Sequence, residues 1–405
     1  MTNLSNLIVV EIAEGIAGPL AGVRLADLGA TVIKVEPNEG DFMREASPAK
    51  VGSDMSAAFF ELNRGKKSVQ LGEKLEQATA AVDALLAKAD VLILDRSQEE
   101  ITALGLEDVT NRFPGLIVVD ISPWGRKGPM ADLQGSELTA QAMAGYTRYL
   151  GRRGLPARRL GSDAGSIGTG IFAVQAALSA LLHRNDGGRG QRISVSILNS
   201  LLSMKSIHLA AQSDPDAYKG PRVGGPHEPV EQGWKTADKP IYFAFGGSVG
   251  ATGRAGWEQF VEEMGMSELL SDSRFDKRGK ASTGHGSEAI RLRPVYEKYF
   301  ANKTSAELVA SMHKHRANAA VYATAVEALE HEQTKALGIV VEVPDHGGQT
   351  KVRAFPGAFS DIVVELKGDA PALGADTGTV LAELGFTPEQ QRALQTAGGI
   401  FGVAA

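Results

Sequence analysis

Short apolar runs alternate with amphipathic stretches through the first 200 residues of the chain. The runs are rich in β-branched residues, which favour strands, and glycine-rich turns lead from them into helical periodicity. Strands are predicted at 7–11, 31–35, 91–94 and 116–120. One predicted helix carries Leu20, Val23, Leu25 and Leu28, and another spans 80–89. Strands separated by helices predict an α/β fold with a parallel, doubly wound sheet.

The pattern changes near residue 205, where Pro and Gly become frequent. We therefore predict a large domain whose first part spans 1–205, followed by a linker at 206–239. A strand at 240–245 and an amphipathic stretch at 257–264 begin a smaller α/β domain, 240–334. From 335 to 405 strands return and a helix follows near 377–384.

Composition and charge narrow the functional class. A net charge of −6 with no long basic run argues against a nucleic-acid partner. The apolar stretch 171–182 falls short of the ~20 residues that a membrane span requires, and the run at 7–10 has no basic region before it, so neither a membrane segment nor a cleavable signal is expected. With no cysteine, thiolate-ligated metals are excluded. We expect a cytoplasmic enzyme or enzyme subunit without metal.

The first strand, turn and helix also suggest a dinucleotide site. Glu36, at the end of the second predicted strand, could then bind a ribose hydroxyl. However, Gly15, Gly18 and Gly22 do not have the G-x-G-x-x-G spacing. We expect instead that these glycines let a helix pack closely on a strand.

Several motifs in order point to a known family. Residues 17–41, AGPLAGVRLADLGATVIKVEPNEGD, resemble the signature of class III (CaiB/BaiF) CoA-transferases, as do LNRGKKSV at 62–69 and the glycine-rich helix and turn at 158–196. Weaker similarities lie at 125–129 with Gln141, Ala142 and Gly145, at 273–275 with Arg278, and at 380–385. The resemblance implies a Rossmann-like large domain built from both chain ends, a small domain, and two chains interlocked as a dimer.

The resemblance also implies the chemistry. In that family an aspartate carboxylate attacks an acyl-CoA thioester and carries CoA to a carboxylic acid. The coenzyme A thioester is then a substrate, and no cofactor is permanently bound. Ala17, Gly18 and Pro19 are the candidate CoA-binding residues.

The expected nucleophile is missing. Counting back from Arg184 and Gly170, where we expect the helix to start, places the family aspartate at Ser166, and the nearest aspartate, Asp163, is three residues out of register. A serine hydroxyl needs an activating base to act as a nucleophile. Acylated serine would be an oxygen ester, which the CoA thiolate has little thermodynamic driving force to displace. Ser166 is therefore expected to cap the helix instead.

Other family positions have also changed. Residues 94–99 lie where the family has E-N-F-R-P-G, and Ala103 replaces an arginine that often precedes L-G-L. A racemase of the same superfamily would need a His/Asp pair. This chain has Ser136 before Glu137 at the histidine position, and Ser166 at the aspartate position.

Two hypotheses remain. In the first, the chain is the non-catalytic subunit of a heteromeric CoA-transferase of the benzylsuccinate type, paired with a paralogous catalytic subunit that carries the aspartate. In the second, the chain pairs with itself as a homodimeric transferase and Asp163 is the nucleophile, with the glycines at 161, 165, 168 and 170 accommodating the shift.

Overall fold

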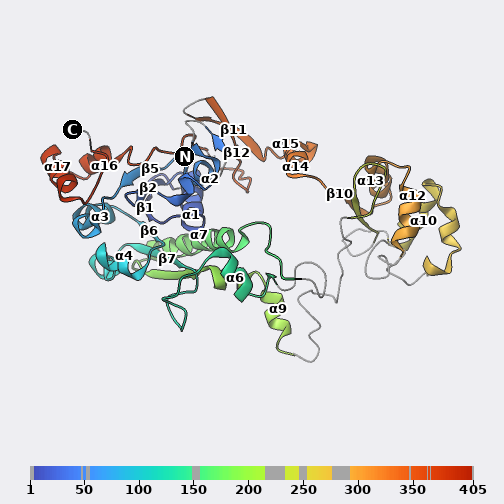
Figure 1. Cartoon of the computed structure of the whole chain (residues 1–405), viewed down its shortest axis with the longest axis horizontal. Helices are drawn as coiled ribbons and strands as arrows, with labels where there is room; N and C mark the ends of the chain where they lie inside the picture. The colour runs from blue at the N-terminus through green and yellow to red at the C-terminus, as the bar shows by residue number, and fades with distance from the viewer. Residues whose placement is uncertain are drawn as a thin grey trace. The chain divides into compact units, whose positions relative to one another are not determined.

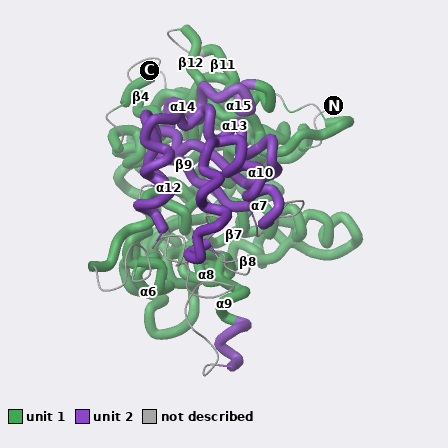
Figure 2. Tube along the Cα trace, turned by 90° about the vertical axis from the view of Figure 1, so that its right-hand side faces the viewer, with its two compact units in different colours: residues 1–209, 336–405 green, residues 210–335 purple. Residues whose placement is uncertain are grey.

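The computed structural model describes residues 4–46, 49–51, 55–147, 156–214, 233–245, 253–275, 292–345, 348–362, 364 and 366–403. The chain divides into two compact units (Figures 1 and 2). Unit 1 comprises Met1–Leu209 and Ala336–Ala405, and unit 2 comprises Ala210–Lys335. Most of the predicted linker, at 215–232, and Arg278 lie outside the described residues.

The centre of unit 1 is a six-stranded sheet in which every paired strand is parallel, as predicted. Its strands are β1 (Ile8–Ile12), β2 (Thr31–Glu36), β5 (Lys67–Gln70), β6 (Val91–Leu94), β7 (Ile117–Ser122) and β8 (Arg192–Ser196). Their order is β5-β2-β1-β6-β7-β8, so the chain reverses its direction of travel across the sheet between β1 and β6. In doubly wound folds the ligand crevice lies at this switch point, at the carboxyl ends of the strands.

Helices cover both faces of the sheet. On one face, α1 (Ala17–Asp27) and α7 (Ala164–Asn185) bury small and branched side chains against β1, β6 and β7. On the other lie α3 (Thr79–Leu86), α4 (Gln98–Ala103) and α5 (Val109–Arg112). The sheet is therefore covered on both sides, which explains why its strands read as continuous apolar runs.

Helix α7 differs from expectation in where it begins. It starts at Ala164, six residues before the predicted Gly170, so Ser166 lies inside its first turn. By length and apolar composition alone α7 could cross a membrane, but half of its most apolar stretch is buried inside the protein. Its buried side contacts α1 and β7, as expected of a core helix.

Shorter elements complete unit 1 and tie its two chain segments together. They are η1 (Phe42–Arg44), β3 (Lys50–Val51), β4 (Met55–Ser56), α2 (Ala57–Asn63), η2 (Leu75–Gln77), α6 (Glu137–Met143), α8 (Ile197–Ser203), the hairpin β11 (Val340–Asp345) and β12 (Gly348–Arg353), α16 (Thr377–Glu383) and α17 (Pro388–Ala397). Helix α9 (Ser206–Ala211) begins in unit 1 and ends in unit 2. The segment after unit 2 covers edge strand β5, because Asp376 accepts a 2.8 Å hydrogen bond from the Ser68 backbone and Ile400 bridges Leu71. An edge strand covered in this way is protected from pairing with another chain.

Unit 2 has an aromatic core around a two-stranded antiparallel sheet. Its elements are β9 (Ile241–Ala244), α10 (Arg254–Glu263), η4 (Ser267–Leu270), η5 (Ser273–Phe275), α12 (Arg293–Phe300), α13 (Ser305–Lys314), β10 (Asn318–Val321), α14 (Ala325–Glu330) and α15 (Glu332–Ala336), which ends in unit 1. Trp234, Trp257 and Tyr296 are fully buried, and the Trp257 indole donates a 2.9 Å hydrogen bond to the Tyr296 hydroxyl. These rings stabilise a core.

Candidate functional site

The candidate CoA-binding residues lie at the switch point. The chain leaves β1, turns at Gly15, and enters the first turn of α1, where Ala17, Gly18 and Pro19 are all buried. A Cβ at Gly18 would stand 2.3 Å from the Cβ of Ala13. The glycine is therefore needed for helix α1 to start this close to the end of its strand.

Buried charges hold this turn in place. The Lys66 ammonium donates to Glu11 at 2.7 Å and to the Pro19 carbonyl at 3.0 Å. The fully buried Lys34 pairs with Glu11 at 3.1 Å and Asp41 at 2.8 Å. Burial outweighs these carboxylates at Lys66 and lowers its pKa to about 8. The 62–69 motif thus fixes the start of α1.

Glu36 does not face a ligand. Its carboxylate is fully buried and accepts from Arg44 at 2.7 Å and from the Ser68 hydroxyl at 2.6 Å. Although burial raises the pKa of Glu36, the hydrogen bonds from Arg44 and the charge of Lys34 lower it further, so the carboxylate stays ionised. A nucleotide ribose has no access to this acid, which removes the structural basis of a dinucleotide site.

An ion pair joins the two loops of the switch point. Arg96, two residues after the end of β6, places its guanidinium 3.1 Å from Glu14, two residues after the end of β1, and 3.8 Å from Glu100 on α4. The neighbouring Asp95 has its pKa raised to about 6 by burial. Asp95 and Arg96 lie within residues 94–99, which we expected to replace the E-N-F-R-P-G element of the family.

Ser166 is bonded to a carboxylate from another helix. Glu137, the first residue of α6, accepts hydrogen bonds at 2.7 Å from both the backbone N–H and the hydroxyl of Ser166. Its other oxygen accepts from the Gly165 N–H at 2.9 Å and the Gln141 amide at 2.7 Å. Glu137 therefore satisfies two of the free N–H groups in the first turn of α7, which stabilises the helix before Gly170. The expectation that Ser166 caps the helix is wrong.

Asp163 lies immediately before α7, as its N-cap residue, but its side chain makes no capping hydrogen bond. The carboxylate instead pairs with Arg159 and remains about one-third exposed. It is thus separate from the Glu137–Ser166 pair.

Close packing of α1 and α7 brings the candidate residues together. A Cβ at Gly170 would stand 2.8 Å from the Ala17 carbonyl oxygen, so the start of α1 contacts α7 there. Ser166 is four residues earlier, about 6 Å along the helix axis. Glu137 belongs to the same site, and its position four residues before Gln141 was the only signal of it in the sequence.

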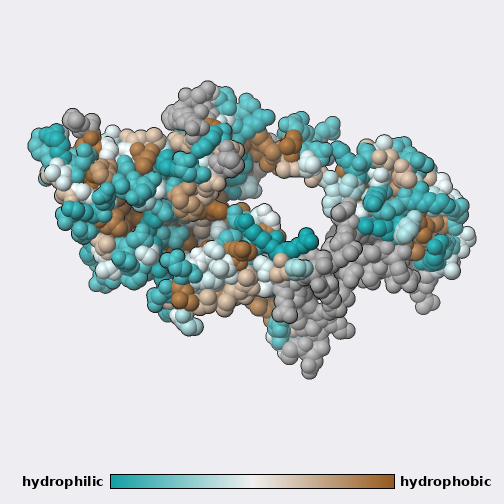
Figure 3. All heavy atoms as spheres, in the orientation of Figure 1, coloured by the Kyte–Doolittle hydropathy of each residue, from teal (hydrophilic) through white to brown (hydrophobic). Residues whose placement is uncertain are grey.

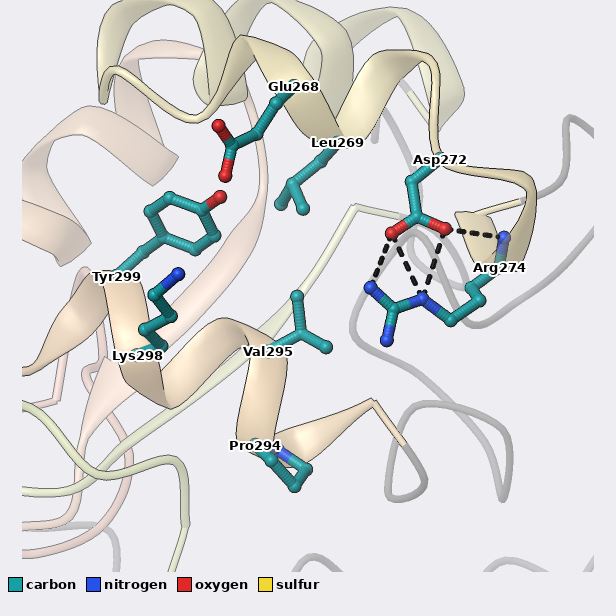
Figure 4. Close-up of a pocket in the computed structure, with 8 residues that line it drawn as sticks. All are labelled: Glu268, Leu269, Asp272, Arg274, Pro294, Val295, Lys298 and Tyr299. Atoms are coloured by element: carbon teal, nitrogen blue, oxygen red, sulfur yellow. Dashed lines mark hydrogen bonds and ion pairs between the residues drawn. The ribbon is translucent and has the colours of Figure 1, made fainter.

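A separate concavity of about 420 Å³ lies within unit 2 (Figure 4). Its lining residues are Glu268, Leu269, Asp272, Arg274, Pro294, Val295, Lys298 and Tyr299. Asp272 is already paired with Arg274 at 2.6 Å, and that hydrogen bond lowers its pKa. Both charge signs line this pocket, so it has no net preference for an anion or a cation.

Comparison with known proteins agrees with the geometry. A family model described as CoA-transferase family III matches residues 4–377. The chain belongs to this family. The succinate–glutarate CoA-transferase of Agrobacterium fabrum is 29% identical over 400 residues, covering 94% of this chain and 95% of that protein.

Another relative is named for a different pair of acids. The formyl-CoA:oxalate CoA-transferase of Streptomyces avermitilis is 26% identical, with 98% of this chain and 99% of that protein covered. A CaiB/BaiF family protein from Brucella suis has the same fold, with a TM-score of 0.79 at 27% identity, covering 95% of this chain and 99% of that one. The predicted membership in an enzymatic family of CoA-transferases is confirmed.

Proposed function

We propose that this chain is a subunit of a class III CoA-transferase that moves CoA between an acyl-CoA, such as succinyl-CoA, and a carboxylic acid, without a catalytic aspartate of its own. The observation that carries this proposal is Ser166, which occupies the nucleophile register while the scaffold around it is intact. The acyl-CoA is a substrate, and no permanently bound cofactor is required. The names of the relatives support the substrate class.

The partner in this proposal is a paralogous class III chain that carries the aspartate, interlocked with this one in the cytoplasm as a benzylsuccinate-type heteromer. Exposed apolar side chains on adjacent helices support an assembly. They are Leu138 and Met143 on α6, Ile167, Ile171 and Leu182 on α7, and Met204, Ile207 and Leu209 on or beside α8 and α9. Figure 3 shows hydrophobic residues reaching the surface of unit 1 between hydrophilic ones. Exposed apolar side chains on neighbouring helices are compatible with an interface between chains.

The competing proposal is a homodimer in which Asp163 is the nucleophile. It is supported by the partial exposure of that carboxylate, one residue before α7. The ion pair with Arg159 would have to open for Asp163 to attack a thioester.

The test is to purify the chain alone and co-expressed with a paralogous class III chain that carries the aspartate. Both samples are assayed with succinyl-CoA and a panel of carboxylic acids. We expect robust turnover only in the co-expressed complex, because the partner's aspartate and the completed assembly are present only there. Robust turnover by the chain alone would overturn the heteromer.

A further inference from the structure

We propose that Glu137 is a nucleophilic carboxylate of this chain and forms a covalent acyl and CoA intermediate at the site where the family aspartate is absent. The inference rests on the proposed function only in taking an acyl-CoA as the substrate. It assigns to α6 a group that the family supplies from α7.

The first argument is position. The Glu137 carboxylate lies 2.7 Å from the Ser166 hydroxyl and 2.7 Å from the Ser166 backbone nitrogen, so it occupies the space beside the residue in the nucleophile register. A capping box between Ser136 and Thr139 fixes the start of α6, and Gln141 bonds the carboxylate one turn later. The carboxylate is therefore held in place from its own helix and from α7.

The second argument is charge and access. Partial burial raises the pKa of Glu137, but hydrogen bonds from Gln141, Ser166 and Gly165 lower it below its ordinary value. Glu137 is thus ionised at neutral pH and only about half-buried. An ionised carboxylate attacks without a base. The same low pKa makes Glu137 a weak base, so activation of the Ser166 hydroxyl by Glu137 is disfavoured.

The third argument is the set of donors. When CoA attacks an acylated Glu137, negative charge develops on the oxygen of the former carboxylate. The N–H groups of Gly165 and Ser166 and the Ser166 hydroxyl already point at these oxygens. Donors arranged in advance stabilise such an oxyanion without reorganisation. In this arrangement Ser166 is a donor and not a nucleophile.

The reaction balances with the named reactants. A Glu137 oxygen attacks the thioester carbonyl, the C–S bond breaks, and CoA leaves as a thiolate, giving a mixed anhydride. The thiolate attacks the Glu137 carbonyl carbon and releases the donor acid as a carboxylate, leaving glutamyl-CoA. The acceptor carboxylate attacks this thioester, the C–S bond breaks and CoA leaves again as a thiolate, giving a second anhydride between the acceptor and Glu137. The thiolate then attacks the acceptor carbonyl, which frees Glu137 and releases the new acyl-CoA.

The test maps the covalent intermediate on the purified assembly, with this chain unmutated. The assembly is mixed with succinyl-CoA and quenched with hydroxylamine, which converts an acylated carboxyl group to a hydroxamate that peptide mass spectrometry locates. We expect the hydroxamate on Glu137. Because the mapping uses the unmutated chain, it does not depend on the folding of a variant.

Variants separate a catalytic role from a structural cap. Glu137→Gln should abolish the hydroxamate, and Ser166→Ala should lower its yield or rate by about 10²–10³-fold through loss of one donor. Glu307→Gln is the matched control, because Glu307 accepts from the backbone and hydroxyl of Thr304 in the same way on α13 of unit 2. It should leave the hydroxamate unchanged.

Hydroxamate mapping can contradict the role of Glu137 without contradicting the proposed CoA-transferase function. A hydroxamate found only on the partner chain or on Asp163 overturns the role of Glu137 and leaves the CoA-transferase proposal standing. If the chain by itself has transferase activity and carries the hydroxamate on Glu137, the heteromer proposal is overturned and the role of Glu137 as nucleophile is supported. Absence of any hydroxamate in every sample, with no turnover, overturns both.

Discussion

At the scale of single residues, Ser166 is the residue that we predict to stand at the nucleophile position of the family. Two carboxylates near it have different environments. Asp163 is paired with Arg159, whereas Glu137 accepts four hydrogen bonds from α6 and α7. Proximity in sequence favoured Asp163, but the contacts of the folded chain favour Glu137.

The first prediction concerns Asp163. Asp163→Ala should leave the CoA-transferase activity of the assembled enzyme within a few fold, because the side chain bonds only Arg159 among the described residues. Loss of a covalent nucleophile would instead lower activity by several powers of ten. The measurement is kcat and KM of the assembly with and without the substitution. A loss of several powers of ten in kcat would instead support the competing proposal, in which Asp163 is the nucleophile.

At the scale of elements, the site depends on how closely α7 approaches α1 and α6. Glycines at 165, 168 and 170 leave room for side chains and backbone of neighbouring helices. The switch-point loops are joined by the Arg96–Glu14 pair. The packing of these helices therefore determines where Glu137 and Ser166 meet. Stability measurements can test this packing separately from catalytic activity.

Gly170→Ala is predicted to destabilise unit 1. In a helix interior, alanine is ordinarily more favourable than glycine by about 0.5–1 kcal/mol. Here its Cβ would stand 2.8 Å from the Ala17 carbonyl and 3.0 Å from Leu20, and such overpacking costs about 1–3 kcal/mol. We expect a net loss in chemical denaturation. Gly115→Ala, whose Cβ meets nothing within 4 Å, is the control and should change stability by less than about 0.5 kcal/mol.

The pH dependence of stability tests the link between α6 and α7. The folded-state pKa of Glu137 lies below its ordinary 4.5, so its contribution is present above the unfolded pKa and is lost as pH falls through the folded value. Glu137→Gln removes this contribution. The difference in unfolding free energy between the two proteins should be largest near about pH 7 and shrink below about pH 4. Urea titrations across this range measure it, and a pH-independent difference would contradict the assignment.

At the scale of the whole molecule, unit 1 is built from both ends of the chain, because the segment after unit 2 returns to cover β5 and α2. The apolar side chains exposed on α6, α7 and α9 remain available to a partner. An interlocked pair should bury far more than the ~1,600 Å² of a standard interface, so a stable free monomer is not expected.

The assembly prediction uses this exposed face. Ile171, which is 48% exposed on α7, should be covered by the partner, and Ile171→Arg should then weaken the complex. Val326→Arg on α14, where the side chain is 70% exposed, is the control and should leave the assembly intact. Analytical ultracentrifugation of co-expressed samples measures the stoichiometry. Equal assembly of both variants would place the partner on another surface.

Local pattern was enough to predict much of this molecule. β-Branched runs and glycine turns predicted the strands of a parallel sheet. Strand propensity, and the continuous apolar run of a strand buried on both faces, are visible within a few residues of sequence. Ordered motifs indicated the family, whereas the assignment of Ser166 to the nucleophile position stays a prediction. The sequence could not determine the start of α7, because Glu137, 29 residues before Ser166, supplies acceptors for the N–H groups of Gly165 and Ser166 in its first turn.

The tertiary structure alone decided which carboxylate contacts Ser166. Glu36, Asp163 and Glu137 are all acids near family motifs, and nothing in their local sequence separates their roles. Folding buries Glu36 against Arg44, pairs Asp163 with Arg159, and brings Glu137 to Ser166 across two helices. The sequence therefore determined the scaffold through short-range pattern. The chemistry depended on long-range contacts, because the ionisation and reach of a carboxylate are set by the groups that surround it in space.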